Sequence, residues 1–398
     1  MSRRTWLPRV GAALVVAAAV GHAAVAGARG PARAIAWSSV VGAIAEGVEE
    51  RASLEIAATP SGVARATTCA EGRERVVAIL ARDGASLTPD EAADATTLGS
   101  DLTSLRADDG SACVDAVLST LRETTRCSRG YAAIVSGIVS SPRAPDDGIE
   151  RLADDATPEC GELVLRALGT GVHATPRLVA FAETSALGVT DPSRGSTAWL
   201  TLGSLGRLAR ARPDQSAIVA HVEDVIRTAL VAANGDARVV MLEAAGNAAC
   251  ASCMGEIERD TRAARWDVRR AAVAALRFQS GSEVPHTICA RLSGDASSGV
   301  REDAAWAMRW RDENDTERIE CLITAAATDP ARAVRKAATL SLIVLAERSS
   351  NARSALNHLT GDRYSEDVRR LATDYTMTVG APVADVSGLS VDGPLYGE

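Results

Sequence analysis

Aromatic residues and lysine are both scarce in this chain of 398 residues. Aromatics make up 3% of the sequence, and Lys336 is the only lysine beside many arginines. Alanine supplies much of the 46% hydrophobic content, which favours closely packed helices over sheets of β-branched and aromatic residues. The formal net charge of −8 argues against a protein that binds the phosphate backbone of nucleic acids.

The sequence also lacks the motifs of common catalytic sites. It contains no HExxH zinc motif, no GxSxG nucleophile elbow and no glycine-rich phosphate loop. The four histidines of the repeat region are scattered one to a helical segment, which does not suit a metal site: His173, His221, His286 and His358. We therefore predict no catalytic, cofactor-binding or metal-binding residues, and a protein that is not an enzyme.

Residues 1–26 have the pattern of an export signal. Three arginines precede an apolar run at 10–20, and small residues at 24–26 suit cleavage. The apolar run is too short for a membrane span, so we expect an exported chain without one, in the periplasm or outside the cell. The pair Arg3-Arg4 leaves the twin-arginine route open beside the general route. An uncleaved anchor is the alternative interpretation.

One helical segment occurs four times between Trp266 and Thr376. Its copies are WDVRRAAVAALR, SGVREDAAWAMR, RAVRKAATLSLI and EDVRRLATDYT, and their valines lie 32, 34 and 34 residues apart, at Val268, Val300, Val334 and Val368. In the first copy the apolar residues recur at i, i+3, i+4, i+7 and i+8, which forms one stripe of an α-helix: Val268, Ala271, Ala272, Ala275 and Leu276. A fixed period of this length predicts a repeat architecture.

A second amphipathic segment follows each of the first three copies. After the first copy, its apolar stripe is Val284, Ile288 and Leu292. Two helices of about 12 residues with short turns fill the period. Neither helix can bury its stripe alone, so neighbouring pairs must stack into one elongated core. The predicted fold is therefore all-α, an α-solenoid of antiparallel helix pairs, and we expect the binding surface on its concave side, lined by the second helices.

The periodicity weakens towards both ends of the chain. We predict an export signal at 1–26, a less regular helical region at 27–110, a solenoid at 111–378 and a flexible tail at 379–398. An unrelated helical bundle with coincidental spacing is the alternative, and four copies in register argue against it.

The repeated segments resemble HEAT repeats. An alanine-rich helix, an acidic turn and a following Asp-Val-Arg carry this resemblance well over residues 236–378 and loosely over 111–235. Residues 200–205 and 242–247 also look like the helical domain of the vitellogenin and microsomal lipid-transfer family, in which helices wrap lipid-binding sheets. The chain departs from that family because it has no stretch rich in alternating β-branched and aromatic residues to build the sheets.

The chain contains eight cysteines, and an even number behind an export signal predicts disulfides. The candidates are Cys69, Cys113, Cys127, Cys160, Cys250, Cys253, Cys289 and Cys321. Cys289 and Cys321 are one repeat period apart, so their helices should be neighbours. The four cysteines nearest the N-terminus are expected to pair with one another, in an order that the spacing leaves open.

The sharpest local motif is Cys250-Ala251-Ser252-Cys253. A CxxC pair at the start of a helix is typical of a redox site, where the helix stabilises a thiolate. Here the motif lies in an inter-helix turn without the βαβ context of a thioredoxin-like site, which favours a structural bridge. A zinc site would need two further ligands, which neither a second CxxC nor a close histidine pair supplies.

Trp306 and Trp310 are one turn apart on a first helix. They could anchor a partner, although packing in the core or between repeats is the alternative for an aromatic pair. Together these observations predict an exported scaffold that binds a protein partner through its solenoid surface. The alternatives are a carrier of lipid or another apolar ligand, and a thiol-redox protein using Cys250 and Cys253.

Overall fold

The computed structural model describes residues 66–82, 87–107, 112–124, 127–189, 192, 195–311 and 316–379. Regular structure in these residues is helical, apart from an isolated bridge between Arg106 and Ala112. The predicted export signal and residues 380–398 of the predicted tail lie outside the described residues. The chain divides into two units, one ending at Val222 and the other beginning at Glu223.

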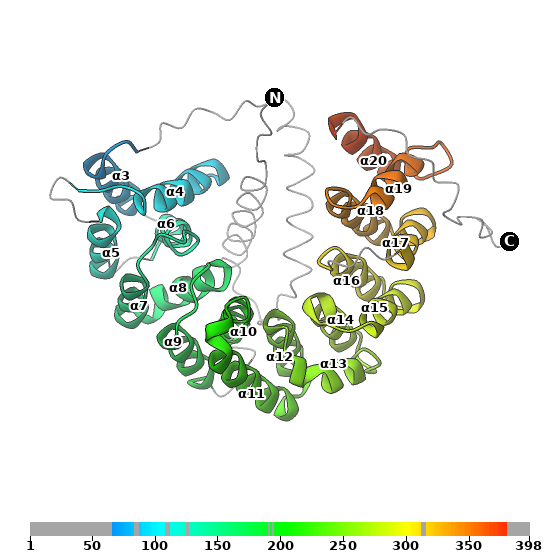
Figure 1. Cartoon of the computed structure of the whole chain (residues 1–398), viewed down its shortest axis with the longest axis horizontal. Helices are drawn as coiled ribbons and strands as arrows, with labels where there is room; N and C mark the ends of the chain where they lie inside the picture. Colours follow the sequence, from blue (N-terminus) through cyan, green and yellow to red (C-terminus); the bar gives the residue numbers. More distant parts are fainter. Residues whose placement is uncertain are drawn as a thin grey trace. The chain divides into compact units, whose positions relative to one another are not determined.

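The first unit stacks its helices in two layers (Figure 1). Helices α4, α6, α8 and α10 pack in succession in one layer, and α3, α5, α7 and α9 form the other. The helices in chain order are α3 (Cys69–Ala81), α4 (Pro89–Leu102), α5 (Cys113–Glu123), α6 (Arg129–Val139), α7 (Asp146–Asp155), α8 (Pro158–Thr170), α9 (Pro176–Leu187) and α10 (Ser196–Arg210). A short 3₁₀ turn, η1 (Pro213–Gln215), leads into α11 (Ser216–Ala232), which crosses into the second unit.

The second unit repeats this arrangement. Its first helices are α12 (Gly235–Ala248), α14 (Trp266–Ala275), α16 (Ser298–Met308), α18 (Arg332–Ala346) and α20 (Glu366–Val379). Its second helices are α13 (Met254–Asp260), α15 (Glu283–Gly294), α17 (Thr316–Thr328) and α19 (Ser350–Leu359), with 3₁₀ turns η2 (Ala251–Cys253) and η3 (Leu276–Phe278). The first helices pack on one another in succession, and each second helix packs on the first helix that follows it, so this unit also has two layers.

The valine of every repeat is buried at the same place in its helix. Val268 is 6% exposed, and its three counterparts are fully buried: Val300, Val334 and Val368. The rest of the stripe in α14 is buried too, between α12 and α16. The predicted all-α fold of stacked helix pairs is therefore confirmed, and alanine-rich stripes form the contacts between repeats.

Small residues allow the first helices to approach closely. A Cβ atom built on Gly246 of α12 would lie 2.5 Å from the Cα atom of Ala275 in α14, which is closer than real atoms come. A larger side chain at Gly246 would have to push α14 away. Close contact between helix backbones is what an alanine-rich and aromatic-poor composition permits.

Several helices of the first unit begin with a threonine cap. At α4, the Thr88 side chain accepts a hydrogen bond from the Glu91 backbone N–H, and the Glu91 carboxylate accepts one from the Thr88 N–H at 2.8 Å. This capping box satisfies two backbone donors that the helix leaves unpaired. Thr68, Thr157 and Thr175 cap α3, α8 and α9 in the simpler one-bond form.

All eight cysteines are paired. The bridges are Cys69–Cys113, Cys127–Cys160, Cys250–Cys253 and Cys289–Cys321. The last bridge joins α15 to α17, which are the second helices of consecutive repeats, as their spacing of one period predicts. The first two bridges lie within the first unit and restrict the chain between α3 and α8.

Replacing Ala272 by aspartate tests the stacked stripe. Ala272 is fully buried in α14, so Ala272→Asp places a carboxylate where no partner or water is available. We expect the free energy of unfolding to fall by more than about 3 kcal/mol. Circular dichroism during thermal unfolding measures the effect. Ala290→Asp on the exposed side of α15 is the matched control, and an equal loss in both variants would contradict the stripe.

Candidate functional site

A continuous chain of arginine–aspartate pairs links the repeats of the second unit. The arginine after the repeated valine reaches the aspartate in the turn before the next first helix: Arg269 to Asp295, and Arg301 to Asp329. Arg269 Nε and Nη2 lie 2.8 and 2.9 Å from the two Asp295 carboxylate oxygens. Arg301 contacts Asp329 in the same two-bonded way, at 2.7 and 3.0 Å.

Each aspartate also serves the next arginine through its backbone. Arg301 Nη1 donates to the Asp295 carbonyl at 2.8 Å, and Arg335 Nη1 donates to the Asp329 carbonyl at 3.0 Å. Arg335 then contacts Asp367 at 3.3 Å. We call the series from Arg269 to Asp367 the arginine–aspartate ladder. It holds successive repeats in one register.

The ladder lies mostly out of solvent. The Asp295 side chain is 2% exposed and that of Arg269 is 15% exposed. The hydrogen bonds from Arg269 hold the pKa of the Asp295 carboxyl below its ordinary value, although burial opposes them. The charge of Asp295 is therefore stabilised by its partner and is not available for proton transfer.

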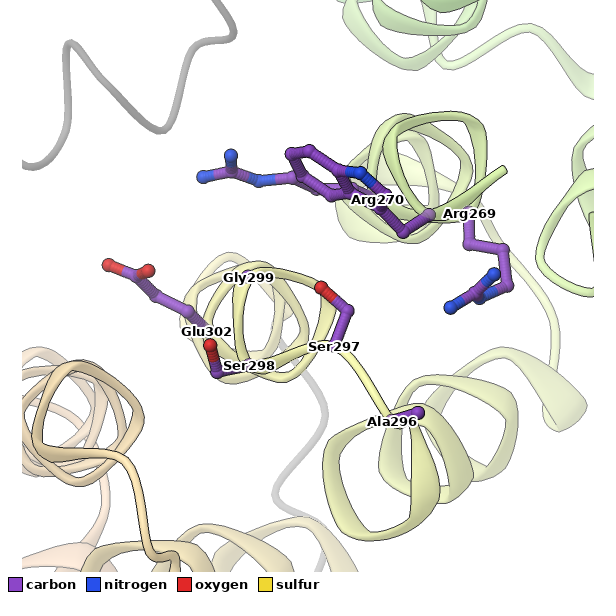
Figure 2. A pocket seen from close by; sticks show the side chains of 8 residues that line it. Arg269, Arg270, Ala296, Ser297, Ser298, Gly299 and Glu302 are labelled. Atoms are coloured by element: carbon purple, nitrogen blue, oxygen red, sulfur yellow. The ribbon is translucent and has the colours of Figure 1, made fainter. Parts of the chain in front are cut away.

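A shallow open cleft of about 520 Å³ lies between the starts of α14 and α16. It is lined by Trp266, Arg269, Arg270, Ala296, Ser297, Ser298, Gly299 and Glu302. Figure 2 shows that Arg270 and Glu302 point to the same side of the two helices, while Arg269 points away towards the repeat junction. Trp266 is 51% exposed, and the absence of a side chain at Gly299 leaves space beside its ring.

The two arginines of this cleft are already paired with aspartates. Arg270 donates two hydrogen bonds to Asp303, at 2.9 and 3.3 Å. Burial raises the pKa of the Asp303 carboxyl to about 6, and Arg270 opposes this rise. Burial also raises the pKa of Glu302. The cleft therefore offers an exposed indole beside paired arginines and the carboxyl group of Glu302, which suits contact with another surface better than catalysis.

A second group lies at the opposite ends of the same helices. Trp306 and Trp310 pack edge to face at 5.5 Å between ring centroids, and Phe278 meets Trp310 at 5.7 Å. Arg277 and Arg309 lie over these rings. We call Arg277, Phe278, Trp306, Arg309 and Trp310 the arginine–tryptophan cluster. Trp310 is 38% exposed and Trp306 is half-buried, so the pair combines the packing and surface positions that the sequence left open.

Both groups belong to first helices and the turns after them. We expected the binding surface on the second helices, and the structure instead places the cleft and the exposed tryptophans on α14 and α16. Figure 1 shows the first helices along the inner side of the curve of this unit, with the second helices outside. The direction of this curve depends on how neighbouring pairs tilt, which the spacing of apolar residues does not specify.

The two cysteines of the CxxC motif are bonded to each other. Cys250 and Cys253 form a disulfide, and both residues are fully buried. The carboxylate of Glu223 accepts hydrogen bonds from the backbone N–H groups of Ala251 and Ser252, at 3.2 and 3.3 Å. A buried bridge in a tied turn supports the structural interpretation, because redox exchange needs an accessible sulfur.

The described part of the chain contains no group of three or more histidine, cysteine or acidic residues able to hold a metal ion. His173, within hydrogen-bonding distance of Asp146 and the Ser141 carbonyl, is buried in the first unit. His221 and His286 pair with Glu183 and Glu317 at the surface. Helices long and apolar enough to cross a membrane are also not found in the described residues.

Comparison with known proteins identifies the repeat. Residues 257–343 match the family of HEAT repeats. Among solved structures, the chain is similar to the crystal structure of an engineered protein, with 16% identity over 77% of this chain and 88% of the other, and a TM-score of 0.31. No curated protein matches. The family match confirms the HEAT resemblance for this stretch. The resemblance to the lipid-transfer family is not tested and stays a prediction.

Breaking one rung tests the arginine–aspartate ladder. Arg269→Gln leaves Asp295 buried without its countercharge, so we expect the free energy of unfolding at pH 7 to fall by about 3 kcal/mol. The stabilisation by this pair exists above the ordinary carboxyl pKa of 3.8 and is lost as the pH falls through the lowered native value. The deficit of the variant should therefore shrink below pH 3.8.

Denaturant unfolding of the wild type and the variant across pH measures this difference. Arg291→Gln is the matched control, because Arg291 approaches the same carboxylate only to 4.0 Å. Equal losses for the two variants, or a loss independent of pH, would show that the Arg269 pair does not carry the stabilisation.

Proposed function

We propose that this protein is an exported scaffold that binds a protein partner through the first helices of its second unit. The observation that carries the proposal is the exposure of two tryptophans on this surface, Trp266 at 51% and Trp310 at 38%. Tryptophan dominates the binding energy of protein interfaces because it buries a large rigid ring beside a polar N–H group.

The two tryptophans are placed as separate anchors. Trp266 begins α14, and Trp310 follows the end of α16, the next first helix. Since each helix has about ten residues at a rise of about 1.5 Å, the anchors are about 15 Å apart along the helix direction. A contact surface of this span agrees with the patch that one partner covers in a protein complex. HEAT-like repeats suit the role because stacking presents many helices to one partner.

Disulfide pairing supports the exported location. All eight cysteines are bonded, and disulfides persist in oxidising compartments such as the periplasm and the extracellular space. The cleft is open and its walls are mixed polar and apolar, so it is not the enclosed apolar cavity that a lipid carrier needs. A protein partner is therefore the proposal that the described surface favours.

The thiol state of the protein tests the exported location. In protein recovered from the native organism, non-reducing mass spectrometry should find all eight cysteines bonded and an N-terminus at Gly27 after cleavage. Recovery of eight free thiols would contradict both the export and the disulfides. Reduction before alkylation serves as the control, and it should release every cysteine.

Site-specific cross-linking tests the binding surface. A photo-reactive amino acid at Trp266 or Trp310 should cross-link the same protein in the native exported fraction. The identified partner, produced separately, should then bind the unmodified scaffold with saturation in calorimetry. The control position is Thr324, which is exposed on α17 in the layer of second helices. Equal cross-linking from Thr324, or no binding by the purified partner, would contradict the proposal.

A further inference from the structure

Arg309 differs from the arginines of the ladder because no acidic side chain of the described residues pairs with it. Its Cζ atom lies 4.4 Å from the centroid of the Trp306 ring and 5.1 Å from that of Trp310. Within the described part of the chain these two ring faces flank its guanidinium group, while Arg348 Nη2 donates to the Arg309 backbone carbonyl at 2.9 Å. The ladder arginines Arg269 and Arg301, in contrast, each hold a carboxylate with two hydrogen bonds.

Two donors of the cluster are buried without an acceptor. Arg309 Nε and Trp306 Nε1 are shielded from solvent and make no hydrogen bond. Buried N–H groups are nearly always paired in native proteins, because an unpaired donor loses its bonds to water and gains nothing in return. Two such donors on adjacent turns of one helix indicate that this place is completed by a group from outside the described residues.

The cluster also concentrates positive charge. The Cζ atom of Arg277 lies 5.0 Å from the Phe278 ring centroid and 5.8 Å from that of Trp306. Its guanidinium donates to the Ala274 carbonyl at 2.6 Å and to the Asn247 side-chain oxygen. Burial, and then the charge of Arg277, lowers the pKa of Arg309 to about 10. An anion beside Arg309 would remove this repulsion and favour the charged form.

We infer that Arg309, with Arg277 beside it and Trp306 and Trp310 as its platform, receives a carboxylate from an acidic segment of the protein partner. The inference deepens the proposed function and rests on it. Arginine binds carboxylates in a planar, two-bonded geometry, and rings on its other faces hold it in place. Exposed Trp310 would cover the apolar part of the bound segment.

The charge of the whole chain makes this place selective. With a net charge of −8, most of the surface repels an acidic segment, so a cationic cluster directs it to one end of α16. A nucleic acid would instead need a row of cations along its phosphates, whereas the neighbouring cleft contains the acid Glu302, and its Arg270 is already paired with Asp303. An acidic protein segment therefore fits the cluster better than a polyanion.

Hexaglutamate is the probe for this site, and hexaglutamine is its uncharged control. Binding to the full chain is measured by tryptophan fluorescence and calorimetry. We expect saturable binding of hexaglutamate that weakens when the salt concentration is raised from about 50 mM to about 500 mM. Hexaglutamine should not bind. Inorganic phosphate and anionic phosphatidylglycerol vesicles are tested beside the peptides.

Three variants locate the site. Arg309→Gln should weaken hexaglutamate binding at least about tenfold. Arg227→Gln is the matched control, because Arg227 is an exposed arginine on α11 whose loss changes the net charge equally, and it should bind as the wild type does. Arg309→Lys keeps the charge without the planar fork, and we expect an intermediate loss. Should Arg309→Gln fail to fold by circular dichroism, Arg309→Lys supplies the comparison.

Distinct results would overturn the inference. Unchanged binding by both Arg309 variants would place the anion elsewhere, and no binding of hexaglutamate up to about 1 mM would reject an acidic segment. Equal affinity for inorganic phosphate would indicate a simple anion site, and Arg309-dependent binding of vesicles without peptide binding would indicate a membrane. None of these removes a partner cross-linked from Trp266, so the proposed function is tested separately.

Discussion

The second unit depends on a shared aspartate at each junction between repeats. The side chain of Asp295 binds the arginine of one repeat, and its backbone carbonyl binds the arginine of the next. Hydrophobic stripes supply the attraction between helices, but this attraction is not directional. The two-bonded arginine contact is directional, so it selects one register from those that the stripes allow. The surface carrying Trp266 and Trp310 keeps its spacing because of this register.

Much of the fold could be predicted because the same residue types recur at the spacing of the repeat. Val268, Val300 and Val334 occupy equivalent buried places, and the pairing of Cys289 with Cys321 follows from the same period. The ladder was harder to predict. Its arginines recur in register, but the aspartates follow them at differing separations, so only the folded turns reveal each partner. The prediction that the second helices line the concave side was wrong, since periodicity indicates which faces are buried but not how neighbouring helix pairs tilt.

The candidate site was predictable only in part. Trp306 and Trp310 share one face because they are four residues apart, yet sequence cannot tell how far neighbouring side chains cover that face. Phe278 joins them from the preceding repeat, a contact that no local spacing indicates. Arg309 was not distinguishable among so many arginines. What sets it apart is the absence of a carboxylate within reach in the described residues, which is a property of the packed molecule.

The bridge between Cys289 and Cys321 makes the two layers mechanically unequal. It joins α15 to α17 covalently, whereas α14, α16 and α18 are held together by non-covalent contacts. Bending at this step should therefore change the distances within the first-helix layer more than the distance between α15 and α17. The surface of the first helices is then the side whose curvature changes on bending, while the bridge keeps α15 and α17 together.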